Sequence, residues 1–310
     1  MRFFAGAILH DSSDVHEMDG EAINYTLRVP IGVAACISPW NLPLYLLTWK
    51  IAPALATGNT VVAKPSEITP MTAYLLSKIC KEINFPKGVL NIIHGRGEKL
   101  GDALTTHQDV PIVSFTGGSD TGKHISKVTA PYFKKLSLEL GGKNPNIIFD
   151  DCDFDKAVST ASRAAFTNQG QICLCGSRVF VQNKIYEKFK SALVDKAKKL
   201  IVGDPKNSNS HLGAVVSEEH MNKILLKINE AKKLGGILLC GGERLMLEGE
   251  LKNGYYILPT VFENLAYDCS INNEEIFGPV VTLIPFESED DVVMMANSSE
   301  FGLSASIFTK

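Results

Sequence analysis

The sequence lacks both an excess of charge and an apolar run long enough to cross a membrane. Its 31 Lys and Arg residues nearly balance its 34 Asp and Glu residues, whereas nucleic-acid-binding proteins usually carry a basic surface. Hydrophobic residues make up 45% of the chain, but Pro, Lys or Gly interrupts each apolar run before it could span a bilayer. We therefore expect a soluble protein with neither a nucleic-acid nor a membrane partner.

A secretory leader and a disulfide framework are also missing. The first residues contain a single Arg and a short apolar patch, acidic residues follow at once, and there is no convincing cleavage site. The seven cysteines are odd in number and scattered over a long chain. These observations favour a reducing compartment, and the sequence predicts a cytoplasmic location.

Strand-like and helix-like segments alternate along most of the chain. A short apolar strand predicted at residues 59–65 precedes an amphipathic helix predicted at 69–83. The alternation resumes after Gly142 with a strand at 144–149 and a helix through Ala157 to Ala165. This order is typical of α/β folds in which helices cover both faces of a parallel sheet.

The length of 310 residues is sufficient for two such units, and the Gly141-Gly142 pair is the predicted junction. Residues 12–30 are extended in character but have no helix to pair with. We interpret them as a β arm that leaves the domain. Internal repeats and low-complexity tracts are absent from the sequence.

Two cysteines stand one residue apart in FTNQGQICLCGSR, residues 166–178. A structural metal site needs about four paired ligands, and Cys173 and Cys175 have no second Cys or His cluster to join. A disulfide between residues i and i+2 would be strained. Two interpretations of Cys173 stay open: a buried packing thiol, or a nucleophile whose thiolate is stabilised by backbone N–H groups in a glycine-framed turn. For Cys175 we keep the packing interpretation.

A carboxylate stands at the end of a predicted strand in KKLSLELGGKNP, residues 134–145. Three leucines alternate with Ser137 and Glu139, so a strand would bury the leucines on one face and turn Glu139 to the other. The end of a parallel strand is where α/β enzymes place their chemistry, although an ordinary solvated glutamate fits the same pattern.

Six motifs in this order resemble those of the NAD(P)-dependent aldehyde dehydrogenase superfamily. They are SPWNLP at 38–43, VVAKPSE at 61–67, FTGGSDTG at 115–122, LELGGKNP at 138–145, NQGQICLCGSR at 168–178 and EEIFGPVV at 274–281. Cys173 and Glu139 also keep that family's spacing. The residues around these motifs resemble most the 2-aminomuconic semialdehyde dehydrogenase branch of the family. Related 2-hydroxymuconic semialdehyde and betaine aldehyde dehydrogenases share many of the same residues.

The resemblance covers essentially the whole chain, but the chain does not cover the whole family fold. It implies an α/β fold with a Rossmann-type parallel-sheet cofactor domain, an α/β catalytic domain and a β oligomerisation arm. Residues 1–11 would be a remnant of the cofactor-binding domain, 12–30 the oligomerisation arm, 31–141 a partial NAD-binding domain, and 142–310 a catalytic domain that is incomplete at its C-terminus. We expect the complete protein to be a homodimer or homotetramer, and the 310-residue chain alone to be poorly soluble and inactive.

The resemblance also implies a catalytic set. Cys173 would attack a small-molecule aldehyde, and Asn41 with the backbone N–H of Cys173 would hold the resulting oxyanion. Glu139 would be the general base for hydrolysis of the thioester. The sequence contains no flavin or metal motif, so the hydride acceptor would be a nicotinamide. On local sequence alone, Asn41 is predicted to be a turn residue beside Pro43.

The implied cofactor contacts extend over both predicted domains. Gly117 and Gly122 frame a turn into a helix where a pyrophosphate would meet backbone N–H groups, and Ser119 would replace a hydroxyl lost at Gly118. Lys64 and Glu67 would hold the adenosine ribose, and an acid there favours NAD over NADP. The full set that the resemblance assigns to the cofactor is Ser38, Trp40, Lys64, Glu67, Gly97, Gly117, Ser119, Gly122, Leu140, Glu275 and Phe277.

Each of these assignments has a simpler reading. The glycine turn is compatible with an ordinary tight loop, Lys64 and Glu67 with a surface ion pair, and Glu275 and Phe277 with a connection that ends at Gly-Pro. Two other classes of protein also stay open: a cysteine hydrolase that uses Cys173 with one of seven histidines, and a non-catalytic interaction protein that retains the fold. The sequence shows no His-bearing catalytic motif in support of the first.

Overall fold

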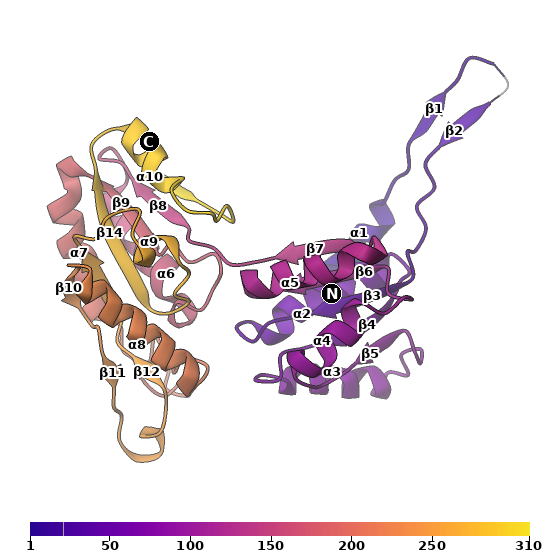
Figure 1. Cartoon of the computed structure of the whole chain (residues 1–310), viewed down its shortest axis with the longest axis horizontal. Coiled ribbons are helices and arrows are strands. Elements are labelled where there is room, and N and C mark those ends of the chain that lie inside the picture. The colour runs from indigo at the N-terminus through magenta and orange to yellow at the C-terminus, as the bar shows by residue number, and fades with distance from the viewer. Residues whose placement is uncertain (21) are drawn as a thin grey trace. The chain divides into compact units, whose positions relative to one another are not determined.

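The computed structural model describes residues 1–20 and 22–310, and the chain divides into two compact units, Met1–Leu140 and Gly141–Lys310 (Figure 1). The division follows the strand that ends in Glu139, at the Gly141-Gly142 pair.

The first unit is built on a five-stranded parallel sheet in the order β5-β4-β3-β6-β7. Its strands are β3 (Val33–Ile37), β4 (Thr60–Lys64), β5 (Leu90–Ile92), β6 (Ile112–Thr116) and β7 (Lys135–Glu139). Its helices are α1 (Arg2–Ala7), η1 (Ile8–His10), α2 (Pro43–Ala56), α3 (Met71–Glu82), α4 (Gly97–Thr105), α5 (Ser119–Thr129) and η2 (Ala130–Tyr132). The strand order reverses at β3, which pairs with β4 on one side and with β6 on the other.

Alternate side chains of β3 enter different apolar clusters. Ala34 lies in a buried cluster with Ile51 of α2, whereas Ala35 lies in another with Leu104 of α4 and Ile125 of α5. Because successive strand residues point to opposite faces, helices cover both faces of this sheet. The predicted α/β fold with a parallel sheet is therefore confirmed.

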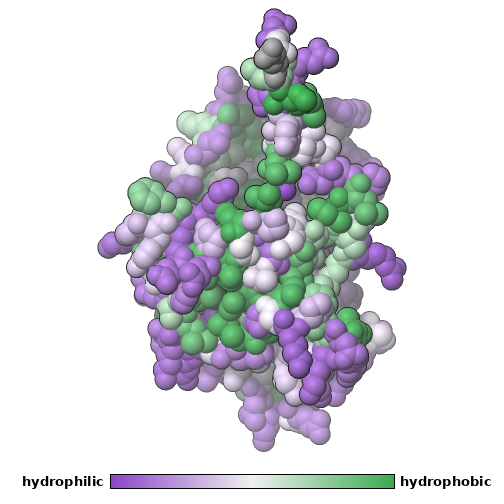
Figure 2. All heavy atoms as spheres, turned by 90° about the vertical axis from the view of Figure 1, so that its right-hand side faces the viewer, coloured by the Kyte–Doolittle hydropathy of each residue, from purple (hydrophilic) through white to green (hydrophobic). Residues whose placement is uncertain are grey.

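A short antiparallel hairpin occupies part of the predicted arm. β1 (Val15–Glu17) pairs with β2 (Ile23–Tyr25), with Val15 opposite Tyr25, and all of these residues are exposed. Glu21, which falls within the predicted arm, lies outside the described residues. Figure 2 shows apolar residues gathered in the middle of the face that it displays. Exposed Trp49 of α2 and Ile79 of α3 are among the large apolar side chains of this unit.

The second unit is built on a six-stranded sheet in the order β10-β13-β14-β9-β8-β15. Its strands are β8 (Pro145–Ile148), β9 (Arg178–Gln182), β10 (Ile237–Cys240), β13 (Thr260–Glu263), β14 (Val280–Phe286) and β15 (Ser306–Phe308), and β11 (Arg244–Leu245) pairs separately with β12 (Tyr256–Ile257). Its helices are α6 (Phe154–Phe166), η3 (Thr167–Gly170), η4 (Asn183–Ile185), α7 (Tyr186–Lys198), α8 (Glu218–Lys233), η5 (Gly249–Leu251), α9 (Ser270–Asn273) and α10 (Glu289–Ala296).

One strand of this sheet departs from the predicted parallel arrangement. β10 runs antiparallel to β13, whereas the other strand pairs of the sheet are parallel. β10 lies at the edge, where a strand pairs on one side only and can be added in either direction. The alternation of helices and strands in the sequence does not specify that direction.

Side chains cap the first turns of α6, α8 and α10 in the second unit. Asp153, Ser217 and Ser288 each accept a hydrogen bond from a backbone N–H in the first turn of α6, α8 and α10 respectively. Such caps satisfy donors that have no partner within the helix. The helix predicted through Ala157 to Ala165 is confirmed, and its cap places its start at Phe154.

Arg178, the first residue of β9, is fully buried and joins three segments. Its Nε donates to the carbonyl of Lys143 at 2.8 Å, and its Nη2 donates to the carbonyl of Ala296 at 2.8 Å. Nη1 donates to the carbonyl of Met295 at 3.3 Å. Burial lowers the pKa of Arg178 to about 10, so the guanidinium stays charged at neutral pH. A cation at the C-terminal end of α10 is favourable for the helix dipole.

We predict that Arg178→Met lowers the free energy of unfolding of the second unit by at least about 3 kcal/mol, because several buried carbonyls lose their donors. The matched control is Arg163→Met on the exposed side of α6, which should change stability by no more than about 0.5 kcal/mol. Urea denaturation followed by circular dichroism measures the effect. Both tryptophans, Trp40 and Trp49, lie in the first unit, so tryptophan fluorescence monitors that unit separately. Equal losses in the two variants would contradict the prediction.

Candidate active site

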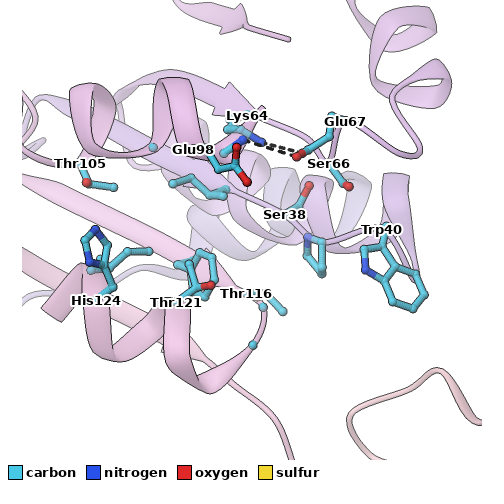
Figure 3. Close-up of a pocket in the computed structure, with 18 of the residues that line it drawn as sticks. Ser38, Trp40, Lys64, Ser66, Glu67, Glu98, Thr105, Thr116, Thr121 and His124 are labelled. Carbon is cyan, nitrogen blue, oxygen red and sulfur yellow. Dashed lines mark hydrogen bonds and ion pairs between the residues drawn. The ribbon is translucent and has the colours of Figure 1, made fainter. Parts of the chain in front are cut away.

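A hollow of about 750 Å³ opens at the carboxyl ends of the strands of the first unit (Figure 3). Ser38 follows β3, Lys64 ends β4, and Thr116 ends β6, and all three line it. The hollow therefore lies where the strand order reverses, which is the usual ligand position in open α/β sheets. Six of the predicted cofactor-binding residues line it: Ser38, Trp40, Lys64, Glu67, Gly97 and Gly117.

An ion pair crosses one side of this hollow, as Figure 3 shows. Lys64 is only 4% exposed, and its Nζ lies 3.2 Å from Oε2 of Glu67. Oε1 of Glu67 accepts a hydrogen bond from the N–H of Gly97, the first residue of α4, at 3.4 Å. Partial burial acts to raise the pKa of Glu67, but hydrogen bonds from its own backbone, Lys64 and Gly97 together bring the pKa below its usual value. A fixed carboxylate therefore lies beside the hollow at neutral pH.

The glycine turn after β6 allows close packing at the other side. A Cβ at Gly117 would come within 2.4 Å of the Phe115 ring, and a Cβ at Gly122 would come within 2.5 Å of Leu140. The turn leads into α5, whose first residues carry N–H groups without partners in the helix. Ser119 begins α5, and its neighbours Gly118, Asp120 and Thr121 line the hollow.

Glu139 ends β7 at the same edge of the sheet. It lies opposite Thr116 in the strand register, it is exposed, and its carbonyl accepts a hydrogen bond from Gly117 at 3.1 Å. Leu136 and Leu138 pack against the buried cluster beneath α5, as the alternation predicts. Asn41 lies in the turn before α2 and is half-buried.

A buried lysine near Glu139 was not predicted from the sequence. Lys50 of α2 is 8% exposed, and its Nζ donates to Oγ of Ser114 at 3.1 Å. Burial lowers the pKa of Lys50, while interactions with Cys36 and with the carboxylate of Glu139 act in the opposite direction. The available signal was a single cation within the apolar helical stretch PLYLLTWKIAPALA.

In the second unit, Cys173 lies in a strained loop between α6 and β9. Asn168 and Gln169 have φ of 52° and 56°, and Gly170 has φ of 70°. Left-handed backbone costs about 1–3 kcal/mol at a residue other than glycine, so surrounding contacts must maintain it. One such contact is made by Gln171, whose Oε1 accepts a hydrogen bond from the N–H of Val216 at 3.0 Å.

The side chain of Asn144 binds backbone carbonyls of the cysteine loop. The Nδ2 of this buried residue donates to the carbonyl of Cys173 at 2.6 Å and to that of Cys175 at 3.0 Å. Gly142 lies so close that a Cβ there would come within 2.7 Å of the Cys173 carbonyl. Cys173 is half-buried. Burial raises the pKa of Cys175 to about 12, so that thiol stays protonated and is a poor nucleophile.

Glu275 and Phe277 lie on a turn of the same unit. Oε1 of Glu275 accepts a hydrogen bond from the N–H of Gly142 at 3.1 Å. Burial raises the pKa of Glu275, although this hydrogen bond and the buried Lys143 oppose the shift. Burial also lowers the pKa of Lys143 to about 7. Phe277 has φ of 57°, another left-handed residue.

The predicted site residues are thus divided between the units. Asn41, Glu139 and most of the predicted cofactor contacts belong to the first unit, whereas Cys173, Glu275 and Phe277 belong to the second. All seven cysteines are free. Over residues 1–20 and 22–310, no group of three or more His, Cys, Asp or Glu residues could hold a metal ion. Within the same ranges, none of the helices has the length and apolar character needed to cross a membrane.

The protein is of the α/β class. A Rossmann-type parallel sheet with a hollow at its switch point is followed by a second α/β unit, whose cysteine loop is held by Asn144. Residues 1–310 match the model of the aldehyde dehydrogenase family, and the chain belongs to that family.

Individual relatives are similar over nearly the whole chain. The 2-aminomuconic semialdehyde dehydrogenases of Danio rerio and Homo sapiens are 47% and 46% identical over 100% and 99% of the chain. A crystal structure of betaine aldehyde dehydrogenase from Staphylococcus aureus in complex with NAD⁺ is 44% identical, with a TM-score of 0.94, over 99% of this chain and 61% of that one. The chain spans 64% of the length of the two curated relatives.

We predict that Gly170→Ala destabilises the second unit by more than about 2 kcal/mol. A Cβ at this position would come within 2.1 Å of the Gly278 carbonyl, and φ of 70° is unfavourable for alanine. The matched control is Gly213→Ala, where the added Cβ meets Gln169 at an ordinary 3.5 Å. Denaturation followed by circular dichroism compares the two. A loss at Gly170 no larger than at Gly213 would argue against this close approach.

Proposed function

We propose that the complete protein oxidises an aldehyde to a carboxylic acid with NAD as the hydride acceptor. Membership of the aldehyde dehydrogenase family supports the reaction class. The observation that carries the proposal is the fixed position of Cys173. Asn144 donates a hydrogen bond to its carbonyl, Gly142 packs against that carbonyl, and Cys173 lies in a loop with left-handed residues. A packing thiol needs no such support.

The residues of the first unit suit a dinucleotide. The hollow at the switch point is large enough for a nucleotide, and the N-terminus of α5 offers N–H groups for phosphate. Glu67 would accept a hydrogen bond from the 2′-hydroxyl of the adenosine ribose and would repel a 2′-phosphate. Glu275 and Phe277 would contact the nicotinamide end. When bound, NAD supplies the hydride acceptor.

The protein groups divide the remaining chemistry. Sγ of Cys173, as a thiolate, forms a bond to the aldehyde carbon, and the carbonyl oxygen becomes an oxyanion. Asn41 and the N–H of Cys173 stabilise that oxyanion, and one such donor lowers the barrier by about 2.7–4 kcal/mol. After hydride loss leaves a thioester, Glu139 takes a proton from water. The water oxygen bonds to the carbon, the carbon–sulfur bond breaks, and the acid leaves.

For the substrate we propose 2-aminomuconate semialdehyde, oxidised to 2-aminomuconate in tryptophan catabolism through the kynurenine pathway. The names of the relatives that are 46–47% identical support this choice. A betaine-type aldehyde is the second candidate, supported by the similar structure from Staphylococcus aureus. Comparison of the two aldehydes as substrates of the complete protein decides between them.

Two further proposals concern the setting of the enzyme. The exposed β1–β2 hairpin would take part in a homo-oligomer, dimer or tetramer, because its edges can accept strands from another copy. The seven free cysteines support a reducing, cytoplasmic location. Size-exclusion chromatography of a variant without residues 12–30 tests the first point.

We predict that Cys173→Ala abolishes aldehyde-dependent NADH formation in the complete protein and changes the Kd for NAD by less than about threefold. The thiol is needed only for the covalent step. Cys175→Ala is the matched control and should retain turnover, because its thiol is protonated at neutral pH. NADH absorbance and equilibrium binding measure the two effects. Turnover that survives Cys173→Ala would exclude the mechanism, and NAD binding without any turnover in the unmodified protein would favour a non-catalytic interaction protein.

We also predict that Glu67→Gln shifts the ratio of kcat/KM for NADP over NAD upward by about tenfold, since a repulsive charge near the 2′-phosphate is removed. Lys64→Ala should weaken both cofactors, and Glu82→Gln on the exposed surface of α3 should change neither. Steady-state kinetics with each cofactor provide the ratios. An unchanged ratio in Glu67→Gln would show that this acid does not face the ribose.

A further inference from the structure

The turn that carries Glu275 and Phe277 has a backbone conformation that its own sequence does not favour. Phe277 has φ of 57°, in the left-handed region that bulky aromatic residues rarely occupy. Gly278 and Pro279 follow directly, and β14 starts at Val280. Contacts from outside the turn must therefore hold Phe277 in this state.

Two elements enclose the turn. Gly170 of the cysteine loop packs against the turn, because an added Cβ there would come within 2.1 Å of the Gly278 carbonyl. Ile224 of α8 also packs against the turn, because a Cβ at Gly278 would come within 2.6 Å of it. Both contacts are packing contacts, and neither satisfies the carbonyl of Phe277.

His220 of α8 supplies that hydrogen bond. Its Nε2 lies 2.8 Å from the Phe277 carbonyl, and its ring meets the Phe277 ring edge to face, with centroids 6.2 Å apart. A carbonyl oxygen can only accept, so Nε2 carries the hydrogen. His220 lies one turn before Ile224 on the helix, so one face of α8 contacts both Phe277 and Gly278.

The start of α8 fixes the position of the imidazole. Ser217 caps the helix and accepts a hydrogen bond from the backbone N–H of His220 at 3.2 Å. A neutral ring suits this place, because the N-terminal end of a helix is unfavourable for a cation. Burial, which lowers the pKa of His220 despite the hydrogen bond to Phe277, favours the same neutral form.

We propose that His220 is a positioning residue that keeps Phe277 left-handed, and that it thereby presents Glu275 and Phe277 to the nicotinamide end of the cofactor. The second half of this inference rests on the proposed function. The first half concerns the fold of the second unit alone. Glu275 is two residues before Phe277, and its carboxylate accepts a hydrogen bond from the N–H of Gly142. A change in the Phe277 backbone would therefore move the backbone of Glu275 and displace its carboxylate.

The first test is hydrogen–deuterium exchange on the complete protein. His220→Phe keeps an aromatic ring but removes the donor, and we expect exchange in residues 275–281 to become at least about tenfold faster, a change of about 1.4 kcal/mol. Residues 178–182 of β9 serve as the internal control and should not change. His220→Gln, whose amide can donate, should restore most of the protection. Unchanged exchange in His220→Phe overturns the proposal.

A second variant removes the strain instead of the donor. Glycine adopts positive φ at no steric cost, so in a Phe277→Gly background the added effect of His220→Phe on exchange should shrink to less than about threefold. An undiminished effect means that His220 acts elsewhere and overturns the proposal. Circular dichroism of each variant confirms that it folds, and His220→Gln provides the comparison if His220→Phe does not.

Cofactor binding by the complete protein tests the second half. His220→Phe should weaken NAD about tenfold and leave the affinity for ADP within about twofold, because ADP lacks the nicotinamide end. Equal affinities for NAD with and without His220 would overturn the link to the cofactor. If the unmodified protein binds neither ADP nor NAD, the proposed function fails, and the exchange experiment still decides whether His220 holds the turn.

Discussion

The side-chain amide of Asn144 is the interaction on which the second unit's cysteine loop depends. Its Nδ2 binds two carbonyls of the loop, those of Cys173 and Cys175, while its Oδ1 accepts the N–H of Ser304 at 3.1 Å. One buried side chain therefore joins the loop to the segment before β15. Because both of its donors and its acceptor oxygen are used, a substitution that removes either end costs the loop partly buried hydrogen bonds. The three consecutive left-handed residues before Cys173 can persist because their neighbours are fixed in this way.

The two units hold their predicted site residues in place differently. In the first unit the support is electrostatic: Lys64 pairs with Glu67, and Glu67 in turn meets the N-terminus of α4. In the second unit it is steric and hydrogen-bonded, since glycines without Cβ atoms allow backbone segments to approach closely. Because Lys64 is buried, salt screens its ion pair with Glu67 less than it would screen a pair between two exposed side chains.

The regular part of the fold followed from the sequence because its causes are local. Apolar stretches of strand and helix length predicted β4, α3 and α6. The alternation of leucines with Ser137 and Glu139 predicted β7, with Glu139 as its last residue. The direction of β10 did not follow, since an edge strand can pair either way. Lys50, Asn144 and His220 were also not predicted, because each acts through a partner distant in sequence. The strained backbone of Phe277 has no sequence signal, since it is imposed by α8 and the cysteine loop.

The contacts of Arg178 have a consequence for synthesis on the ribosome. The carbonyl of Ala296, which this guanidinium binds, belongs to a residue made 118 positions later. At about 5–20 residues per second, that interval lasts about 6–24 s. Until α10 emerges, the guanidinium keeps its hydration, because burial of a charge without its acceptors is costly. The guanidinium can therefore take up its full set of buried hydrogen bonds only after α10 has been made.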